Sequence, residues 1–182
     1  KQSIMPLLHP DIDLFLIDGS RTEAGRKWAE TAAQTYETCL HAQVTGGADA
    51  YICYALQHML DETECPYVGL CENDVLLHPD WPGPVLALFD RGAGEGLAVG
   101  AVSARSYEDR ILVQRDGYAL MHNLGAGHII FTREAAKLVL KHVRNHYTVG
   151  NRKTFHQLSG LDIGKWWAFG GGAHFITHDW GI

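Results

Sequence analysis

An acidic triplet, Glu72-Asn73-Asp74, stands directly after the apolar run 67–71. Residues two apart on a strand project to the same face, so the carboxylates of Glu72 and Asp74 are expected to lie side by side. Two neighbouring carboxylates repel each other, and a divalent cation bound between them removes that cost. Oxygen ligands favour hard cations, so the spacing predicts a Mg²⁺ or Mn²⁺ site with positions left open for phosphate oxygens.

Three further side chains are candidates for chemistry at such a site. Asp162 is a candidate general base toward an acceptor hydroxyl, a role usually taken by a carboxylate. His178 closes the last apolar stretch and is a candidate third metal ligand, because neutral imidazole suits Mn²⁺. Arg105 is a candidate for contact with phosphate. Each residue also has an alternative without chemistry: Asp162 would cap a turn, His178 would be an exposed histidine and Arg105 would be a solvated cation.

Hydrophobic periodicity predicts the elements that must position these residues. One helix is expected to bury a stripe that includes Ala24, Trp28 and Ala32, widened by Ala29 and Ala33. Asp80 and Thr132 are expected to cap helices, and a glycine-rich link is expected over 91–96. The expected strands are 12–17, 41–45, 66–71, 97–104, 110–114, 118–122, 128–131 and 173–177, and the expected helices are 23–40, 48–60, 82–89 and 133–146.

The order of these elements predicts one α/β domain over residues 1–182. Strand and helix alternate in the first half, which favours a mainly parallel central sheet with flanking helices, and a small antiparallel part follows. The apolar run 66–71 is typical of a central strand. Ligands of open parallel sheets bind at the carboxyl ends of the strands, and both Asp18 and the 72–74 triplet fall there.

Composition narrows the possible partners. The chain is 46% hydrophobic and 20% charged, with a formal net charge of -6, which indicates a globular protein and argues against a nucleic-acid partner. The four cysteines lack C-x-x-C spacing, and reduced core cysteines fit a cytoplasmic protein. No apolar stretch reaches the length of about 20 residues that spans a bilayer, so peripheral contact is the form of membrane association left open.

Several segments resemble the core of family 2 glycosyltransferases. In that family a helix is followed by a strand that runs into a D-x-D triplet and then by a Pro-Asp-Trp helix start, and here the matching segments are 50–60, 67–74 and 78–81. Residues 14–20 resemble the family's strand ending in Asp-Gly-Ser. Residues 125–135 resemble its glycine-rich strand and the start of the following helix.

The resemblance implies a glycosyltransferase A-type (GT-A-like) fold and a metal-dependent transfer of sugar from a UDP- or GDP-linked donor to a glycan or other acceptor. Asp74 would bind the metal and, through it, the diphosphate, while Glu72 would reach the metal through water or touch the ribose. Asn73 lies in the same triplet, and Asp18 and Ser20 would lie near the nucleoside. The metal would act as a Lewis acid toward the departing nucleotide diphosphate.

Three departures from the family pattern favour an alternative function. Glu72 stands where the family has Asp, and Ile17 stands where many members have a second Asp. The family's first nucleotide-binding strand is not evident before Pro10, so we expect it to be missing at the N-terminus. The alternative is a catalytically degenerate protein of the same fold that binds a nucleotide or glycan. A nucleotidyltransferase would need a glycine-rich phosphate loop after the first strand, which the sequence lacks.

Overall fold

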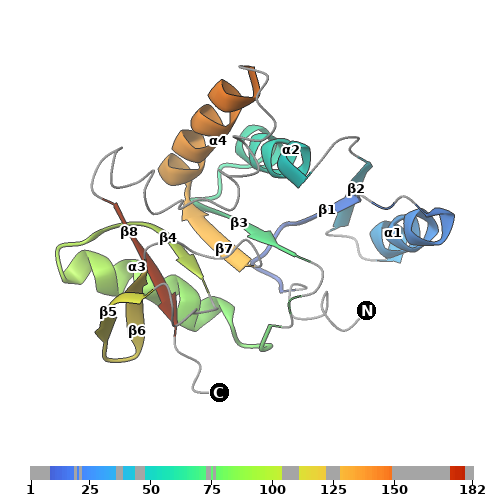
Figure 1. Cartoon of the computed structure of the whole chain (residues 1–182). Helices are drawn as coiled ribbons and strands as arrows, with labels where there is room; N and C mark the ends of the chain where they lie inside the picture. Colours follow the sequence, from blue (N-terminus) through green and yellow to red (C-terminus); the bar gives the residue numbers. More distant parts are fainter. Residues whose placement is uncertain are drawn as a thin grey trace.

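The computed structural model describes residues 9–18, 20, 22–35, 39–43, 48–72, 75, 77–103, 111–121, 128–148 and 173–178. Every strand and helix expected above is present (Figure 1). In chain order they are β1 (Leu14–Asp18), α1 (Glu23–Thr35), β2 (Cys39–Gln43), α2 (Ala48–Glu62), β3 (Tyr67–Cys71), α3 (Pro82–Gly94), β4 (Ala98–Ser103), β5 (Ile111–Arg115), β6 (Tyr118–Met121), β7 (His128–Thr132), α4 (Arg133–Thr148) and β8 (Ala173–His178).

The main sheet is mostly antiparallel, so the prediction of a mainly parallel central sheet is wrong. Its six strands lie in the order β3-β7-β4-β8-β6-β5. Among these strand pairs β4–β8 is parallel, and the other four are antiparallel. β1 and β2 form a separate parallel pair. The GT-A-like fold expected around a parallel sheet is therefore corrected to a mixed α/β arrangement of these two sheets.

The physical reason is the position of β7. This strand inserts between β3 and β4 and runs antiparallel to both, so the two strands that the helix–strand alternation would pair directly never meet. β3 consequently lies at the edge of the six-stranded sheet and not at its centre. Its burial agrees, because Val68 is its one buried residue.

Helices cover both faces of this sheet, as expected. On β7 the side chains alternate between the faces: Ile129 and Phe131 join one core cluster with Leu56 of α2 and Leu140 of α4. Ile130 joins the second cluster, which is built mainly on α3. Figure 1 shows α2 and α4 together on one side of the sheet and α3 on the other. β7, buried on both faces, is therefore the central strand of the core.

Helix α3 runs five residues past its predicted end. Val85, Leu88, Phe89 and Gly92 form one buried face, so burial against the sheet continues through the segment that composition alone suggested was a link. The helix closes where Gly96 takes a φ of 76°. There the Leu97 N–H donates to the Gly92 carbonyl at 2.9 Å, as in a Schellman motif.

The two predicted helix caps differ in outcome. Thr132 caps α4 as expected, because its Oγ1 accepts a hydrogen bond from the Ala135 N–H at 3.2 Å. Asp80 does not cap α3: the N-cap residue is Trp81, and no side chain accepts a capping hydrogen bond there. Pro82, in the first turn of α3, lacks an N–H that would need such an acceptor.

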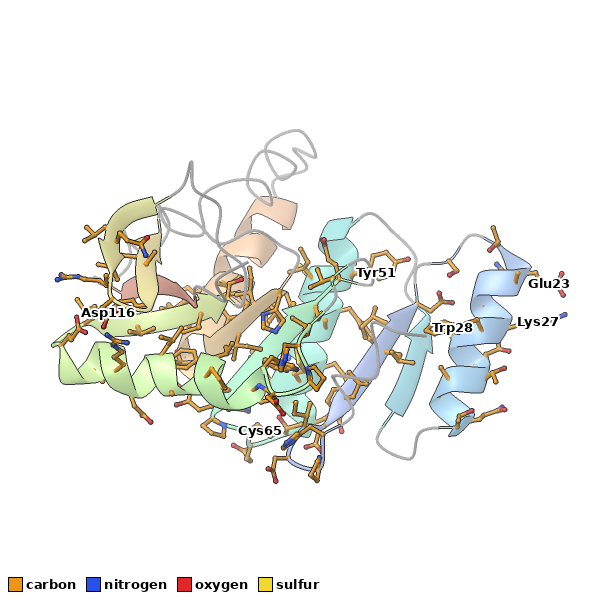
Figure 2. All side chains as sticks on the ribbon, turned by 90° about the horizontal axis from the view of Figure 1, so that it is seen from below. Glu23, Lys27, Trp28, Tyr51, Cys65 and Asp116 are labelled. Carbon is orange, nitrogen blue, oxygen red and sulfur yellow. The ribbon has the colours of Figure 1, made fainter. Side chains whose placement is uncertain are left out.

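Helix α1 is shorter than predicted and buries only part of the predicted stripe. It ends at Thr35, and its buried residues are Ala29 and Ala32. Trp28, which the periodicity placed on the buried face, is 43% exposed. Glu23 and Lys27 form an exposed ion pair on the same helix at 2.7 Å (Figure 2). Small alanine side chains, not the tryptophan, thus mark the face of α1 that packs inward.

The hairpin between β5 and β6 is confirmed at its predicted turn. Gly117 has a φ of 74°, which suits glycine and explains the Asp-Gly sequence. Figure 2 shows Asp116 at the tip of the hairpin, beside α3. Within the ranges that the structure describes, no helix is long and apolar enough to cross a membrane.

Candidate functional site

The strand directions place Glu72 and the backbone of His178 at the same edge of the six-stranded sheet. β3 and β4 both run antiparallel to β7, and β8 runs parallel to β4. The carboxyl ends of β3, β4 and β8 therefore meet at the edge where β7 begins. Glu72 follows β3 directly, Arg105 lies two residues after β4, and His178 ends β8. That these residues bind a ligand at the carboxyl strand ends stays a prediction.

Glu72 follows β3 with its side chain exposed. Its carbonyl oxygen accepts the Val75 N–H at 3.3 Å and the Cys71 thiol at 3.5 Å. These contacts hold the backbone, while the carboxylate remains turned to solvent, where it can bind a cation or a hydroxyl group.

His128 lies next to the carboxyl end of β3 and was not among the residues singled out from the sequence. It opens β7 and stands opposite Cys71 in the strand register. Its side chain is 1% exposed and packs edge-on against the Trp81 ring, with centroids 4.8 Å apart. Burial lowers the pKa of His128 to about 4, so the imidazole is neutral at pH 7. A histidine that precedes an apolar strand can be buried or exposed, and the sequence around His128 does not distinguish the two.

Trp81 and its neighbours form a core cluster next to this edge of the sheet. Trp81 is 5% exposed and belongs to the same core cluster as Val85, Tyr118 and Ile130. Cys71 packs against that cluster from β3. Glu72 therefore follows a strand that is packed against this aromatic cluster.

Asp18 ends β1 and is buried, at 7% exposure. Its Oδ1 accepts a hydrogen bond from the Ser20 N–H at 2.8 Å, so the carboxylate shapes the Asp-Gly-Ser turn itself. The first turn of α1 sits tightly on this turn, because a Cβ added at Gly25 would lie 2.4 Å from the Ser20 Oγ. Asp18 thus has a structural task in addition to the nucleoside contact expected of it.

Asp18 and Glu72 end strands of two different sheets, not one sheet as expected. β1 is held against α2, where Phe15 packs edge-on to His58 with centroids 4.7 Å apart. Just before β1, Ile12 packs against the cluster that contains Trp81. The start of β1 is therefore anchored near β3, although the structure pairs β1 with β2 alone.

The remaining predicted residues are only partly placed. Asn73, Asp74, Arg105 and Asp162 lie outside the described ranges. For His178 the strand is described and the side chain is not; its backbone pairs with Tyr118 of β6. Three strand spacings, about 14 Å, separate β3 from β8, so Glu72 and His178 could share one ion only by reaching across the ends of β7 and β4.

In the part of this edge that the structure describes, Glu72 offers an exposed carboxylate to a divalent metal. Within that part, no three histidine, cysteine, aspartate or glutamate side chains are grouped so as to hold a metal ion. The oxygen chemistry of Glu72 fits Mg²⁺ or Mn²⁺, and a complete ligand set requires further residues, of which the sequence offers Asp74 two positions away.

Comparison of the chain with protein-family models and with curated proteins found no match.

Proposed function

We propose that the chain is a metal-dependent glycosyltransferase that moves a sugar from a UDP- or GDP-linked donor to a glycan or another acceptor. The observation that carries this proposal is the meeting of the carboxyl ends of β3, β4 and β8 at one sheet edge. The exposed carboxylate of Glu72 and the backbone of His178 lie at that edge, and β4, which Arg105 follows by two residues in the sequence, ends there. A diphosphate bound through a cation needs this combination of acidic and basic groups on one side of a rigid scaffold.

Each residue has a chemical role in this proposal. Glu72, Asn73 and Asp74 would hold Mn²⁺ or Mg²⁺, which supplies Lewis-acid stabilisation of the leaving diphosphate when bound. Arg105 would pair with phosphate oxygens as charge develops there. Asp162 would accept the proton of the acceptor hydroxyl. Asp18 and Ser20 would bound the nucleoside, and their turn is already held by the 2.8 Å hydrogen bond between them.

A second candidate function is nucleotide or glycan binding without turnover. Asp18 favours it, because one oxygen of this buried carboxylate is used to hold the backbone of its own turn. Glu72 also differs from the Asp that the resembled family has at this position. Neither feature alters the fold, but both change the side-chain groups that could contact a nucleotide-sugar donor.

A measurement of turnover distinguishes the glycosyltransferase from the protein that only binds. The full chain is incubated with UDP- and GDP-linked hexoses and Mn²⁺, and release of nucleotide diphosphate is measured with and without a panel of acceptor sugars. The glycosyltransferase proposal predicts release that requires the metal and is stopped in Asp162→Asn, while the same variant still binds nucleotide. Binding without release across the panel would favour the second candidate, and normal turnover by Asp162→Asn would remove Asp162 as the base.

A further inference from the structure

Charge is distributed unevenly along the chain. The protein has a formal net charge of -6, yet residues 135–161 contain no aspartate or glutamate. The basic residues of this stretch are Lys137, Lys141, Arg144, Arg152 and Lys153. A basic segment within an acidic chain favours a surface that meets an anionic partner.

The structure shows that this basic stretch begins on one side of α4. Over positions 133–141 of the helix, the exposed side chains are those of Glu134, Lys137, Leu138 and Lys141. Their spacing of three and four residues makes them one continuous stripe of the helix surface, and Arg144 follows at the next position of that stripe. The opposite side of α4 is buried in the core through residues such as Leu140. The helix therefore turns a lysine-rich stripe, called here the α4 stripe, toward solvent.

The ion pair within the α4 stripe does not prevent another contact. Lys137 Nζ lies 2.8 Å from Glu134 Oε1, and both side chains are more than half exposed. An ion pair in such surroundings contributes little to stability, because solvent screens it and both side chains lose freedom. Glu134 is also the last acidic residue before Asp162. An anionic surface can therefore replace Glu134 as the partner of Lys137 at little cost.

Uncharged side chains on and beside the α4 stripe suit a lipid surface. Leu138 lies between the two lysines and is 36% exposed. α2, which packs beside α4 (Figure 1), has no lysine, arginine, aspartate or glutamate from Ala50 to Leu60, and Tyr54 in this stretch is 39% exposed. Basic side chains together with apolar ones are typical of helices at a lipid–water interface. Tyrosine suits the same region, because its ring is apolar and its hydroxyl is polar.

We propose that the α4 stripe docks the protein on an anionic phospholipid surface. Lys137 and Lys141 pair with lipid phosphate groups, and Leu138 enters the headgroup region. The rest of the chain is acidic and is repelled by the same surface, so the electrostatic field orients the molecule with α4 toward the lipid. Nucleic acid is the other polyanion that a basic stripe could bind, and the exposed leucine and tyrosine favour lipid over it. This docking does not depend on the proposed sugar transfer.

The test measures binding of the full chain to lipid vesicles by flotation. Vesicles of equal parts phosphatidylcholine and phosphatidylglycerol are compared with vesicles of phosphatidylcholine alone, at low and at high salt. The expected result is binding to the anionic vesicles that high salt weakens, because salt screens the attraction between charges. Equal binding to the two kinds of vesicle, binding to neither, or a preference for duplex DNA over the anionic vesicles would overturn the proposal.

A double variant with a matched control assigns the binding to α4. Lys137→Gln/Lys141→Gln is expected to weaken vesicle binding by at least about tenfold, since each basic residue near an anionic membrane contributes roughly fivefold. Lys27→Gln/Arg115→Gln is the control, because it removes the same charge from exposed positions of α1 and β5. Lys27 also matches Lys137 in having a glutamate partner. Equal weakening by the two double variants would overturn the role of α4.

Glu134→Gln provides a measurement with the opposite sign. It removes the acidic side chain of the α4 stripe and frees Lys137 from its ion pair, so binding to the anionic vesicles is expected to become stronger. A gain of binding that disappears at high salt cannot result from misfolding. Unchanged or weaker binding by Glu134→Gln would contradict docking through this stripe.

Discussion

His128 is the residue of the site whose behaviour depends most on its surroundings. The sequence pattern would be the same whether His128 were exposed to water or covered by Trp81. The packing of α3 on β7 decides that it is covered. The 1% exposure of His128 and its pKa of about 4 both follow from that packing. The sequence could therefore predict the strand that contains His128 but not the neutral, buried imidazole.

The depressed pKa of His128 predicts an acid sensitivity of the fold. The unfolded chain binds a proton at this residue below about pH 6.5, whereas the folded chain does so only near pH 4. Stability is therefore lost as the pH falls through this window, by about 2 kcal/mol at pH 5. Urea unfolding at pH 7.5 and at pH 5 measures the loss, which should shrink in His128→Phe and persist in His58→Phe. An equal loss in His128→Phe would assign the sensitivity to other groups.

Tyr118 shows a second residue-level effect, at the opposite end of the pH scale. Its ring is fully buried, its hydroxyl donates to the Glu95 carboxylate, and the Arg91 guanidinium lies over the ring at 4.8 Å. Burial and then the hydrogen bond to Glu95 raise the pKa of Tyr118 above its ordinary value of 10.0.

The hydrogen bond between Tyr118 and Glu95 links the β5–β6 hairpin to the end of α3. Tyr118→Phe is expected to cost about 1 to 2 kcal/mol of unfolding free energy, because the hydroxyl bond is lost and the ring packing stays. Since the folded pKa is raised, the contribution of this group is complete below pH 10 and declines above it, so the variant should lose less stability than the wild type between pH 9 and pH 11. Identical denaturation curves for the two proteins at pH 7 would contradict a stabilising role of this hydrogen bond.

The elements were well predicted, but apart from the β5–β6 hairpin their pairing in the main sheet was not. The boundaries of β3, β6 and β7 follow from apolar runs and turn residues that act within a few positions. Pairing depends instead on which strand covers which edge, and nothing local to β7 shows that it inserts between β3 and β4. For the same reason α3 was ended too early, since the burial of Gly92 depends on the sheet beneath it.

The β3–β7 pairing makes a specific prediction about Gly69. A Cβ at this position would lie 2.4 Å from Ile130 Cδ1, the residue opposite it in the register. Gly69→Ala is therefore expected to destabilise the protein by about 1 to 3 kcal/mol through overpacking. Ile130→Val removes the Cδ1 atom that would collide.

A double-mutant cycle separates this effect from general damage to the strand. The penalty of Gly69→Ala, measured by urea unfolding, should be smaller when Ile130 is already Val than in the wild type. Penalties that simply add would mean that β3 and β7 do not face each other in this register. Gly94→Ala serves as the control, because a Cβ there meets nothing within 4 Å.

For the whole molecule, the position of Glu72 after a strand could be predicted from the sequence, whereas the arrangement of the sheets could not. Glu72 was expected at the carboxyl end of a strand and is found there, exposed. The expected parallel sheet would have placed Asp18 on the same edge, whereas the structure puts it at the end of a separate β1–β2 pair. The edge that unites Glu72 with the ends of β4 and β8 arises from long-range pairing, which local sequence patterns do not encode.

The most direct measurement is a calorimetric titration of UDP into the full chain, with Mn²⁺ and again with a chelator. We expect binding that requires the metal and that weakens by at least about tenfold, or 1.4 kcal/mol, in both Glu72→Gln and Asp74→Asn, while Glu64→Gln, far from the carboxyl end of β3, leaves it unchanged. UDP binding of equal strength with the chelator, or in the two site variants, would contradict a nucleotide held through a cation at the end of β3.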